Sequence, residues 1–236
     1  FAGADRTRSD EEPTLRDGVN YALGRREPRA LLSLAATLSI FGLGACLAML
    51  PVYARDILHR GASGYGGLMA AVGVGAGAGA ITMAAFGHRL DRRRVIGRAA
   101  LLFSLSLAGL ALTGTYLLAL VGLAVAGFGS VLSAICTNTL LQTEAPDHLR
   151  GRVMGFYSFV VLGLSPFGAL QAGWLTEHAG VPVSLAVGAT VCAVAALLLA
   201  KERIGAYQPE GMSAVTPRRP KVVGRRRRVP HRVGPK

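Results

Sequence analysis

The sequence predicts an all-α polytopic membrane protein with six transmembrane helices. In its central part the charged residues stand in short clusters, separated by long runs that contain no Asp, Glu, Lys or Arg. A bilayer core about 30 Å thick is crossed by roughly 20 apolar residues in a helix. Four of the runs accommodate one span each, and the longest accommodates two. The runs are 30–54, 61–87, 99–143, 153–176 and 178–200.

Composition agrees with burial in lipid. The chain is 51% hydrophobic and only 17% charged, whereas soluble domains carry about 25% charged residues. The net charge of +13 could indicate a nucleic-acid partner. However, no aromatic residue interleaves with the arginines of 225–228, so stacking on bases is not expected. We therefore expect the bilayer, and no nucleic acid, as a partner.

The basic residues also predict the orientation of the chain. Six spans place both termini on the same side of the membrane. Of the 26 Lys and Arg residues, only Arg55 and Arg60 then lie in loops on the opposite side. Basic residues collect on the cytoplasmic side, so both termini are predicted to be cytoplasmic.

Residues 1–29 form a polar segment that we expect to be a cytoplasmic linker. Within it, Leu15, Val19, Ala22 and Leu23 recur at helical spacing. This pattern indicates a short amphipathic helix on the membrane surface, over roughly residues 14–27. The first span is expected to follow at 30–52.

The second span, expected at 64–86, is rich in glycine. Pairs of small residues four positions apart allow another helix backbone to approach closely, which is how membrane helices pack. We therefore predict a close helix–helix contact here. The residues of the two overlapping pairs are Gly73, Gly75, Gly77 and Gly79.

The fifth span carries a proline near its middle. Pro166 removes a backbone hydrogen bond, and Gly168 follows two residues later, so we expect a kink that can flex. The alternative is that the proline is simply tolerated, as is common in membrane helices. The last four spans are expected at 96–112, 117–141, 153–175 and 183–200, followed by a basic, disordered cytoplasmic tail at 201–236.

The loop after the second span has the spacing G-x-x-x-D-R, formed by Gly87, Asp91 and Arg92. Asp91 is expected to accept hydrogen bonds from backbone N–H groups at the start of a neighbouring helix. Arg92 is expected to pair with a carboxylate or to cap a helix. Such a cluster suits a cytoplasmic gate. The alternative is a basic loop that only fixes topology.

The loop after the fourth span reads Q-x-x-x-P-D-x-x-R-G-R-V-x-G and places Arg150 and Arg152 at the membrane surface, where we expect them to belong to the same cytoplasmic gate. Together with the first loop and Pro166-x-Gly168, it resembles the C-terminal half of major facilitator superfamily transporters. The resemblance is greatest to the bacterial exporter branch that includes the enterobactin exporter and macrolide efflux proteins. The chain departs from the family pattern after Arg92, because the usual second glycine is absent.

The resemblance implies a secondary active exporter in the bacterial inner membrane. In that superfamily two six-helix halves rock around a cavity at the membrane midplane. The chain begins with Phe1 rather than Met, and we expect a processed chain or a fragment. The implied partners are a missing N-terminal six-helix half, a small-molecule substrate and possible coupling protons. The second span and the glycines of the fifth, Gly163, Gly168 and Gly173, would face that half.

Asn138, Tyr157 and Gln171 are the polar residues that we expect to face the cavity. The alternative for each is a hydrogen bond between helices. No carboxylate lies in any predicted span, so a proton-coupling group would belong to the missing half. A cavity without charge favours a lipophilic or amphipathic substrate, such as a drug or a siderophore-like compound.

Two other classes of protein remain for comparison. An intramembrane enzyme requires paired carboxylates, a histidine cluster or an activated nucleophile within the spans, and the sequence has none. Cysteines 46, 136 and 192 lack metal-ligand spacing, so neither a metal nor a cofactor is expected. A non-transporting six-helix scaffold or assembly subunit has the same hydropathy and stays open as the alternative.

Overall fold

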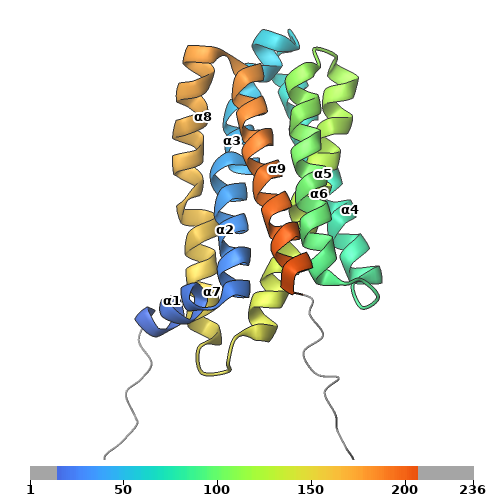
Figure 1. The fold of residues 1–236 in the computed structure, drawn as a ribbon. Helices are drawn as coiled ribbons and strands as arrows, with labels where there is room; N and C mark the ends of the chain where they lie inside the picture. Colours follow the sequence, from blue (N-terminus) through green and yellow to red (C-terminus); the bar gives the residue numbers. More distant parts are fainter. Residues whose placement is uncertain (1–14, 207–236) are drawn as a thin grey trace, which may run out of the picture.

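The structure is a bundle of long helices that run side by side, with no strand among the described residues (Figure 1). It is a computed structural model that describes residues 15–206, so the predicted tail from residue 207 onward lies outside the described part. The elements are α1 (Leu15–Gly24), α2 (Arg26–Phe41), α3 (Leu43–Val52), the π-helix η1 (Tyr53–Ile57), α4 (Ala62–Phe86), α5 (Arg92–Leu112), α6 (Tyr116–Glu144), α7 (Arg150–Ser158), the π-helix η2 (Phe159–Gly163), α8 (Ser165–Ala179) and α9 (Val181–Ala206).

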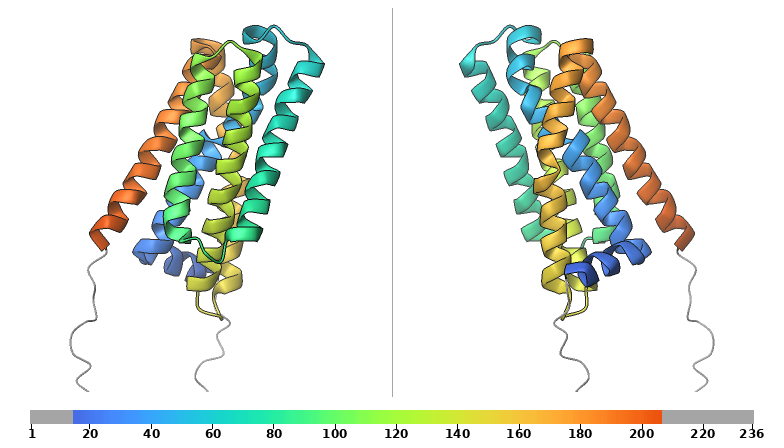
Figure 2. Two further views of the ribbon diagram at one scale, coloured as in Figure 1. Left: turned by 90° about the vertical axis from the view of Figure 1, so that its right-hand side faces the viewer. Right: turned by 90° about the vertical axis from the view of Figure 1, so that its left-hand side faces the viewer.

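Six helical stretches in the described part of the chain are long and apolar enough to cross a membrane. Four are single helices, α4, α5, α6 and α9. The first stretch joins α2, α3 and η1, and the fifth joins α7, η2 and α8. The predicted all-α class and the six spans are confirmed. α1 lies across one end of the bundle, and α9 finishes at the same end (Figures 1 and 2).

Several spanning helices are longer than the apolar runs that predict them. The first stretch covers Arg26–Ile57 rather than 30–52. α9 continues to Ala206, into the segment for which we expected disorder. Apolar length determines only the part of a helix that lies in hydrocarbon, and a helix continues beyond it until a residue stops it. α6 ends at Glu144, because Pro146 disfavours a helical conformation in the residue before it.

α4 and α6 approach each other so closely that their backbones touch. A Cβ atom on Gly75 would lie 1.8 Å from the carbonyl oxygen of Ala124, and one on Gly127 would lie 2.3 Å from that of Val72. Glycine is required at both positions, because contacts below 3.0 Å are not tolerated between a Cβ and a backbone atom. The predicted close contact is present, and α6 is the partner.

The glycines of α4 are divided between two faces. Gly75 and Gly79 are buried against α6, whereas Gly73 and Gly77 are exposed and have open space around their Cα atoms. The expectation that the glycine-rich span as a whole faces a missing half is therefore wrong for Gly75 and Gly79. Of these four glycines, Gly73 and Gly77 are left on the outer surface, where Gly66 of the same helix is exposed as well.

The first and fifth spans are each interrupted. Gly42, with φ −100° and ψ −122°, breaks the helix between α2 and α3. In the fifth span the backbone winds as a π-helix over Phe159–Gly163 before α8 begins. Pro166 lies in the first turn of α8, where its missing N–H leaves no hydrogen bond unmade. The interruption predicted at the proline thus occurs in the residues before it.

Candidate functional site

A pocket of about 290 Å³ opens between the first, fourth and fifth spans. Aliphatic residues such as Leu38, Leu47 and Val161 form much of its wall, and no charged residue is among the described residues that line it. Its polar groups are hydroxyls that come from α2, α6, α7 and α8. These residues are Ser39, Ser130, Ser133, Thr137, Tyr157 and Ser165.

The two interrupted spans meet at this pocket. The Ser39 hydroxyl of α2 donates a hydrogen bond of 2.6 Å to the carbonyl oxygen of Val161 in η2. A π-helix changes the partners of its backbone carbonyls, and Ser39 satisfies one of them from the neighbouring span. The break at Gly42 and the π-helix therefore lie side by side and are joined by a hydrogen bond.

Glycines keep the same two spans in close contact on either side of that bond. A Cβ on Gly168 would lie 2.3 Å from the carbonyl oxygen of Ile40, and one on Gly44 would lie 2.7 Å from the Ser165 hydroxyl. Gly168 consequently packs inside this chain, and the expectation that it faces a missing half is wrong. Gly173 has open space around it.

The structure does not bring together the three polar residues that we expected in the cavity. Tyr157 lines the pocket and is 8% exposed. Gln171 lines a separate cavity of about 10 Å³, next to Cys46 and Ser184. Asn138 accepts a hydrogen bond of 2.6 Å from Gln142 of the same helix. Of the three, only Tyr157 lines this pocket, and its contact with a substrate stays a prediction.

The pocket hydroxyls were missed as candidates because isolated Ser and Thr residues are common in membrane helices. The spacing of three of them nonetheless indicates a shared polar face on one helix. Ser130, Ser133 and Thr137 recur after three and then four residues, which places them on one face of a helix. In the structure Ser133 and Thr137 are 2% and 3% exposed.

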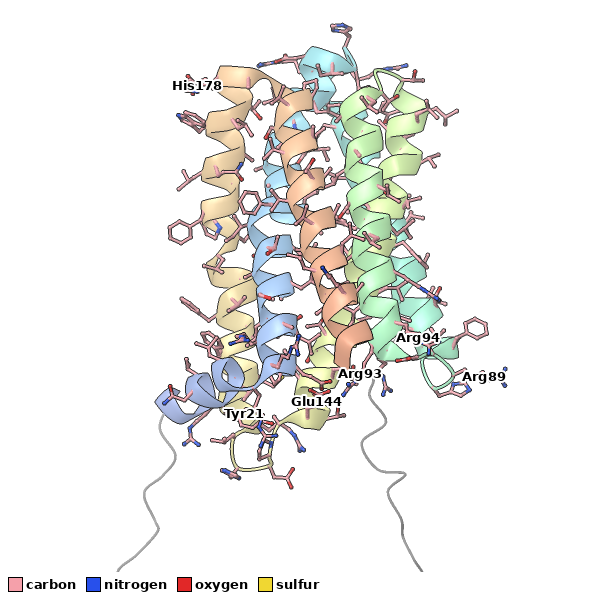
Figure 3. All side chains as sticks on the ribbon, in the orientation of Figure 1. Tyr21, Arg89, Arg93, Arg94, Glu144 and His178 are labelled. Atoms are coloured by element: carbon pink, nitrogen blue, oxygen red, sulfur yellow. The ribbon has the colours of Figure 1, made fainter. Side chains whose placement is uncertain are left out.

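Charged residues gather at the end of the bundle that carries α1 (Figure 3). Asp91 caps α5, the helix that it precedes, by accepting a hydrogen bond of 3.1 Å from the backbone N–H of Arg93. The hydrogen bond that we expected Asp91 to accept at a helix start is thus made with α5, the helix that follows it in the chain. Its other carboxylate oxygen lies 3.1 Å from Arg94. Gly87 caps the preceding helix through its N–H, which donates to the Met83 carbonyl oxygen at 2.9 Å.

Arg93 joins three segments of the chain at this end. Its guanidinium forms a bidentate ion pair with Glu27 at the start of α2, in which the Nη2 to Oε2 distance is 2.8 Å. The same group lies 2.8 Å from the carboxylate of Glu144 at the end of α6. Tyr21 of α1 donates a hydrogen bond of 2.8 Å to the Glu144 carbonyl oxygen. We call Tyr21, Glu27, Arg93 and Glu144 the Arg93 cluster.

The sequence drew attention to Arg92 rather than to Arg93. Arg92 forms no ion pair with any described residue. Consecutive residues of a helix point about 100° apart, so only one of two adjacent arginines faces a given carboxylate. The family spacing thus indicated the residue next to the one that forms the ion pairs.

Arg150 and Arg152 hold the second loop in place. Arg150 pairs with Asp147 at 2.7 Å and donates to the Gln142 carbonyl oxygen at 2.9 Å. Arg152 donates to the His148 carbonyl oxygen at 3.2 Å, and its Cβ would lie 2.6 Å from a Cβ on Gly18 of α1. Both arginines stabilise the loop, and Arg152 also packs against Gly18, where α1 contacts α7.

These features define the chain as a multi-pass α-helical membrane protein with interrupted spans around an uncharged pocket. Residues 10–234 match the family described as transmembrane secretion effector, and the chain belongs to this family of the major facilitator superfamily. The superfamily resemblance predicted from the two loops is confirmed.

Relatives with assigned names are similar to this chain over part of their length. The multidrug efflux pump Tap of Mycobacterium tuberculosis (strain ATCC 25618 / H37Rv) is 30% identical over 166 residues, which are 70% of this chain and 39% of that protein. The pump Tap of Mycolicibacterium fortuitum is 31% identical over 115 residues, 49% of this chain and 28% of that protein. The chain thus spans well under half the length of these curated relatives. No solved structure matches it significantly.

Proposed function

We propose that this chain is the C-terminal six-helix half of an exporter in the bacterial cell membrane. The exporter moves lipophilic or amphipathic small molecules, drugs or siderophore-like compounds, by alternating access against a second six-helix half. The observation that carries the proposal is the uncharged pocket between interrupted spans, in a member of a family with relatives named as multidrug efflux pumps.

The lining of the pocket supports this class of substrate. An ion that entered it would lose its water without meeting an opposite charge, which is strongly unfavourable. A neutral or amphipathic molecule buries its apolar surface against residues such as Leu38 and Leu47 and forms hydrogen bonds with residues such as Ser133 and Thr137. We place the group that couples transport to protons in the second half.

The paired interruptions support alternating access. Helix breaks concentrate bending at a few residues, and here the breaks of two spans are adjacent and joined by the bond from Ser39 to Val161. When one span bends, the other follows. Because both spans line the pocket, their bending changes its opening, which is what exposure to alternate sides of the membrane requires.

We assign the cytoplasmic gate to the end of the bundle that carries α1 and the last turn of α9. The five gate residues expected from the sequence lie in the two loops at this end or in the first turns of the helices that follow them. The Arg93 cluster joins the starts of α2 and α5 to the end of α6. Ion pairs that join separate helices are made in one state and broken in another. Of the residues that the sequence assigns to the gate, we keep Gly87, Asp91, Arg150 and Arg152. We replace Arg92 by Arg93, because Arg92 forms no ion pair with any described residue.

Asp91→Asn separates a gating role of the Asp91 charge from its capping role. Asparagine caps helices as well as aspartate does, so we expect the melting temperature of the purified protein to be unchanged. Loss of the charge removes the pair with Arg94 and is expected to reduce efflux by the two-half protein. Asp91→Ala is the comparison, and should lower stability by about 1 kcal/mol through loss of the cap. Normal efflux in the Asn variant would leave Asp91 as a cap only.

Accumulation of drugs and siderophores in cells that lack their own efflux pumps tests the proposed function. The chain is expressed alone and joined to the six-span half that the proposal places before it. We expect reduced accumulation only for the joined protein. A reduction by the chain alone would show that six helices suffice as a dimer. No effect of either form, with protein present in the membrane, would favour the non-transporting scaffold.

A further inference from the structure

A second cavity, of about 350 Å³, lies between α2 and α9. It is separate from the uncharged pocket of about 290 Å³. α2 contributes Ala35, Leu38 and Ser39 to that pocket and a different set of residues to this cavity. The groove lies toward the end of the bundle that carries α1, where α2 begins and α9 finishes (Figure 1). We call it the α2–α9 groove. Its lining is Arg29, Ala30, Ser33, Leu34, Thr37, Ala195, Leu198 and Leu199.

The mouth of the α2–α9 groove is positively charged. Arg29 is exposed, and its guanidinium forms no ion pair with any described residue. Lys201, also exposed, follows Leu198 by three residues and therefore lies on the same face of α9. Four carboxylates near this end are paired with other arginines, in the pairs Glu27–Arg93, Glu144–Arg93, Asp91–Arg94 and Asp147–Arg150.

The inner part of the α2–α9 groove is apolar. Leu34 and Leu199 are 2% and 4% exposed and form its floor, whereas Leu198 is 58% exposed and forms its side. The hydroxyls of Ser33 and Thr37 donate at 2.9 Å to carbonyl oxygens of their own helix. Both hydroxyl hydrogens are therefore engaged within α2. Beyond Arg29 the groove presents aliphatic side chains and two hydroxyl oxygens that can only accept.

We propose that the α2–α9 groove binds an anionic phospholipid. The phosphate lies against Arg29 at the mouth, and an acyl chain lies along Leu198 and Ala195. Basic pockets between transmembrane helices bind anionic headgroups in this way. A zwitterionic lipid would bring its ammonium group near Arg29 and Lys201, and a free phosphate would leave the apolar inner part unoccupied. The charge and the shape of the groove therefore favour an anionic lipid over both.

Native mass spectrometry of the purified chain in detergent, titrated with dioleoyl phosphatidylglycerol or dioleoyl phosphatidylcholine, tests this proposal. We expect tighter binding of phosphatidylglycerol. Arg29→Gln should weaken that binding about fivefold, the effect of one basic residue near an anionic headgroup. Ala195→Phe should fill the inner part of the groove and remove most of the preference for phosphatidylglycerol.

Matched controls distinguish a site from general attraction to positive charge. Arg89→Gln removes an exposed arginine from the loop before α5 (Figure 3), and Val194→Phe adds the same ring one position away from the groove lining. Both are expected to bind phosphatidylglycerol as the unmodified chain does. Equal losses in Arg29→Gln and Arg89→Gln, or unchanged binding in Ala195→Phe, would overturn the proposal. Full displacement of the lipid by inorganic phosphate would also overturn it.

Discussion

Gly75→Val is expected to prevent the six-helix bundle from folding stably. Even the Cβ of the new side chain would lie 1.8 Å from the carbonyl oxygen of Ala124, and α4 and α6 would have to move apart. Overpacking against side chains that can adjust costs about 1–3 kcal/mol. Here the obstacle is backbone, so we expect a larger loss. Thermal unfolding in detergent, followed by circular dichroism and size-exclusion profile, measures it.

Gly77→Val is the matched control for this prediction. Gly77 lies in the same helix, two positions further on, and has open space around its Cα atom. Both variants replace glycine by valine within α4, so they change helix propensity equally. We expect Gly77→Val to unfold near the temperature of the unmodified chain. An equal loss in both variants would show that propensity, rather than contact with α6, governs stability.

Gly127→Val should reproduce the defect from the opposite helix, since a Cβ on Gly127 would lie 2.3 Å from the Val72 carbonyl oxygen. In lipid no hydrophobic force drives helices together, and close backbone packing takes its place. Reciprocal glycines on α4 and α6 provide that packing. We therefore expect the two helices to stay together as one unit during the proposed transport movement.

The number and position of the spans were predictable from the sequence because lipid imposes a simple length requirement. A helix must supply about 20 apolar residues to cross the hydrocarbon, and charged residues within that length are strongly unfavourable. The faces of those spans were less predictable. Gly73 precedes Gly77 by four residues, just as Gly75 precedes Gly79. Only the rotation of α4 about its axis decides that the second pair contacts α6. Rotation is set by packing, which the apolar pattern of a membrane helix does not encode.

The helix interruptions were predictable only in part. Pro166 marked the correct span, since proline cannot continue a helix without loss of a hydrogen bond. The actual disturbance occupies η2, and the proline begins the helix that follows. The break at Gly42 carried no distinct signal, because glycine is frequent throughout this chain. It lies three residues after Ser39, which donates a hydrogen bond to Val161 in the neighbouring π-helix.

Arg93→Gln is expected to reduce efflux by the two-half protein about tenfold while the chain stays folded. The Glu27, Arg93 and Glu144 side chains are 50%, 50% and 22% exposed, and exposed ion pairs contribute only about 0–1 kcal/mol each to stability. Without Arg93, however, two carboxylates face each other across the start of α2 and the end of α6. A shift of about 1.4 kcal/mol between gate states changes their ratio tenfold. Drug accumulation and melting temperature, measured on the same variant, separate the two effects.

Arg92→Gln removes the same charge one position earlier, where no described residue forms an ion pair with it, and is expected to leave efflux near normal. A second variant tests the cause directly. If repulsion between Glu27 and Glu144 disturbs the gate, Arg93→Gln combined with Glu144→Gln should recover much of the lost efflux, because one of the two facing charges is gone. Equal defects in the Arg92 and Arg93 variants would point instead to the total positive charge of the loop. A double variant as impaired as Arg93→Gln alone would mean that the ion pairs themselves, rather than the repulsion they relieve, hold the gate.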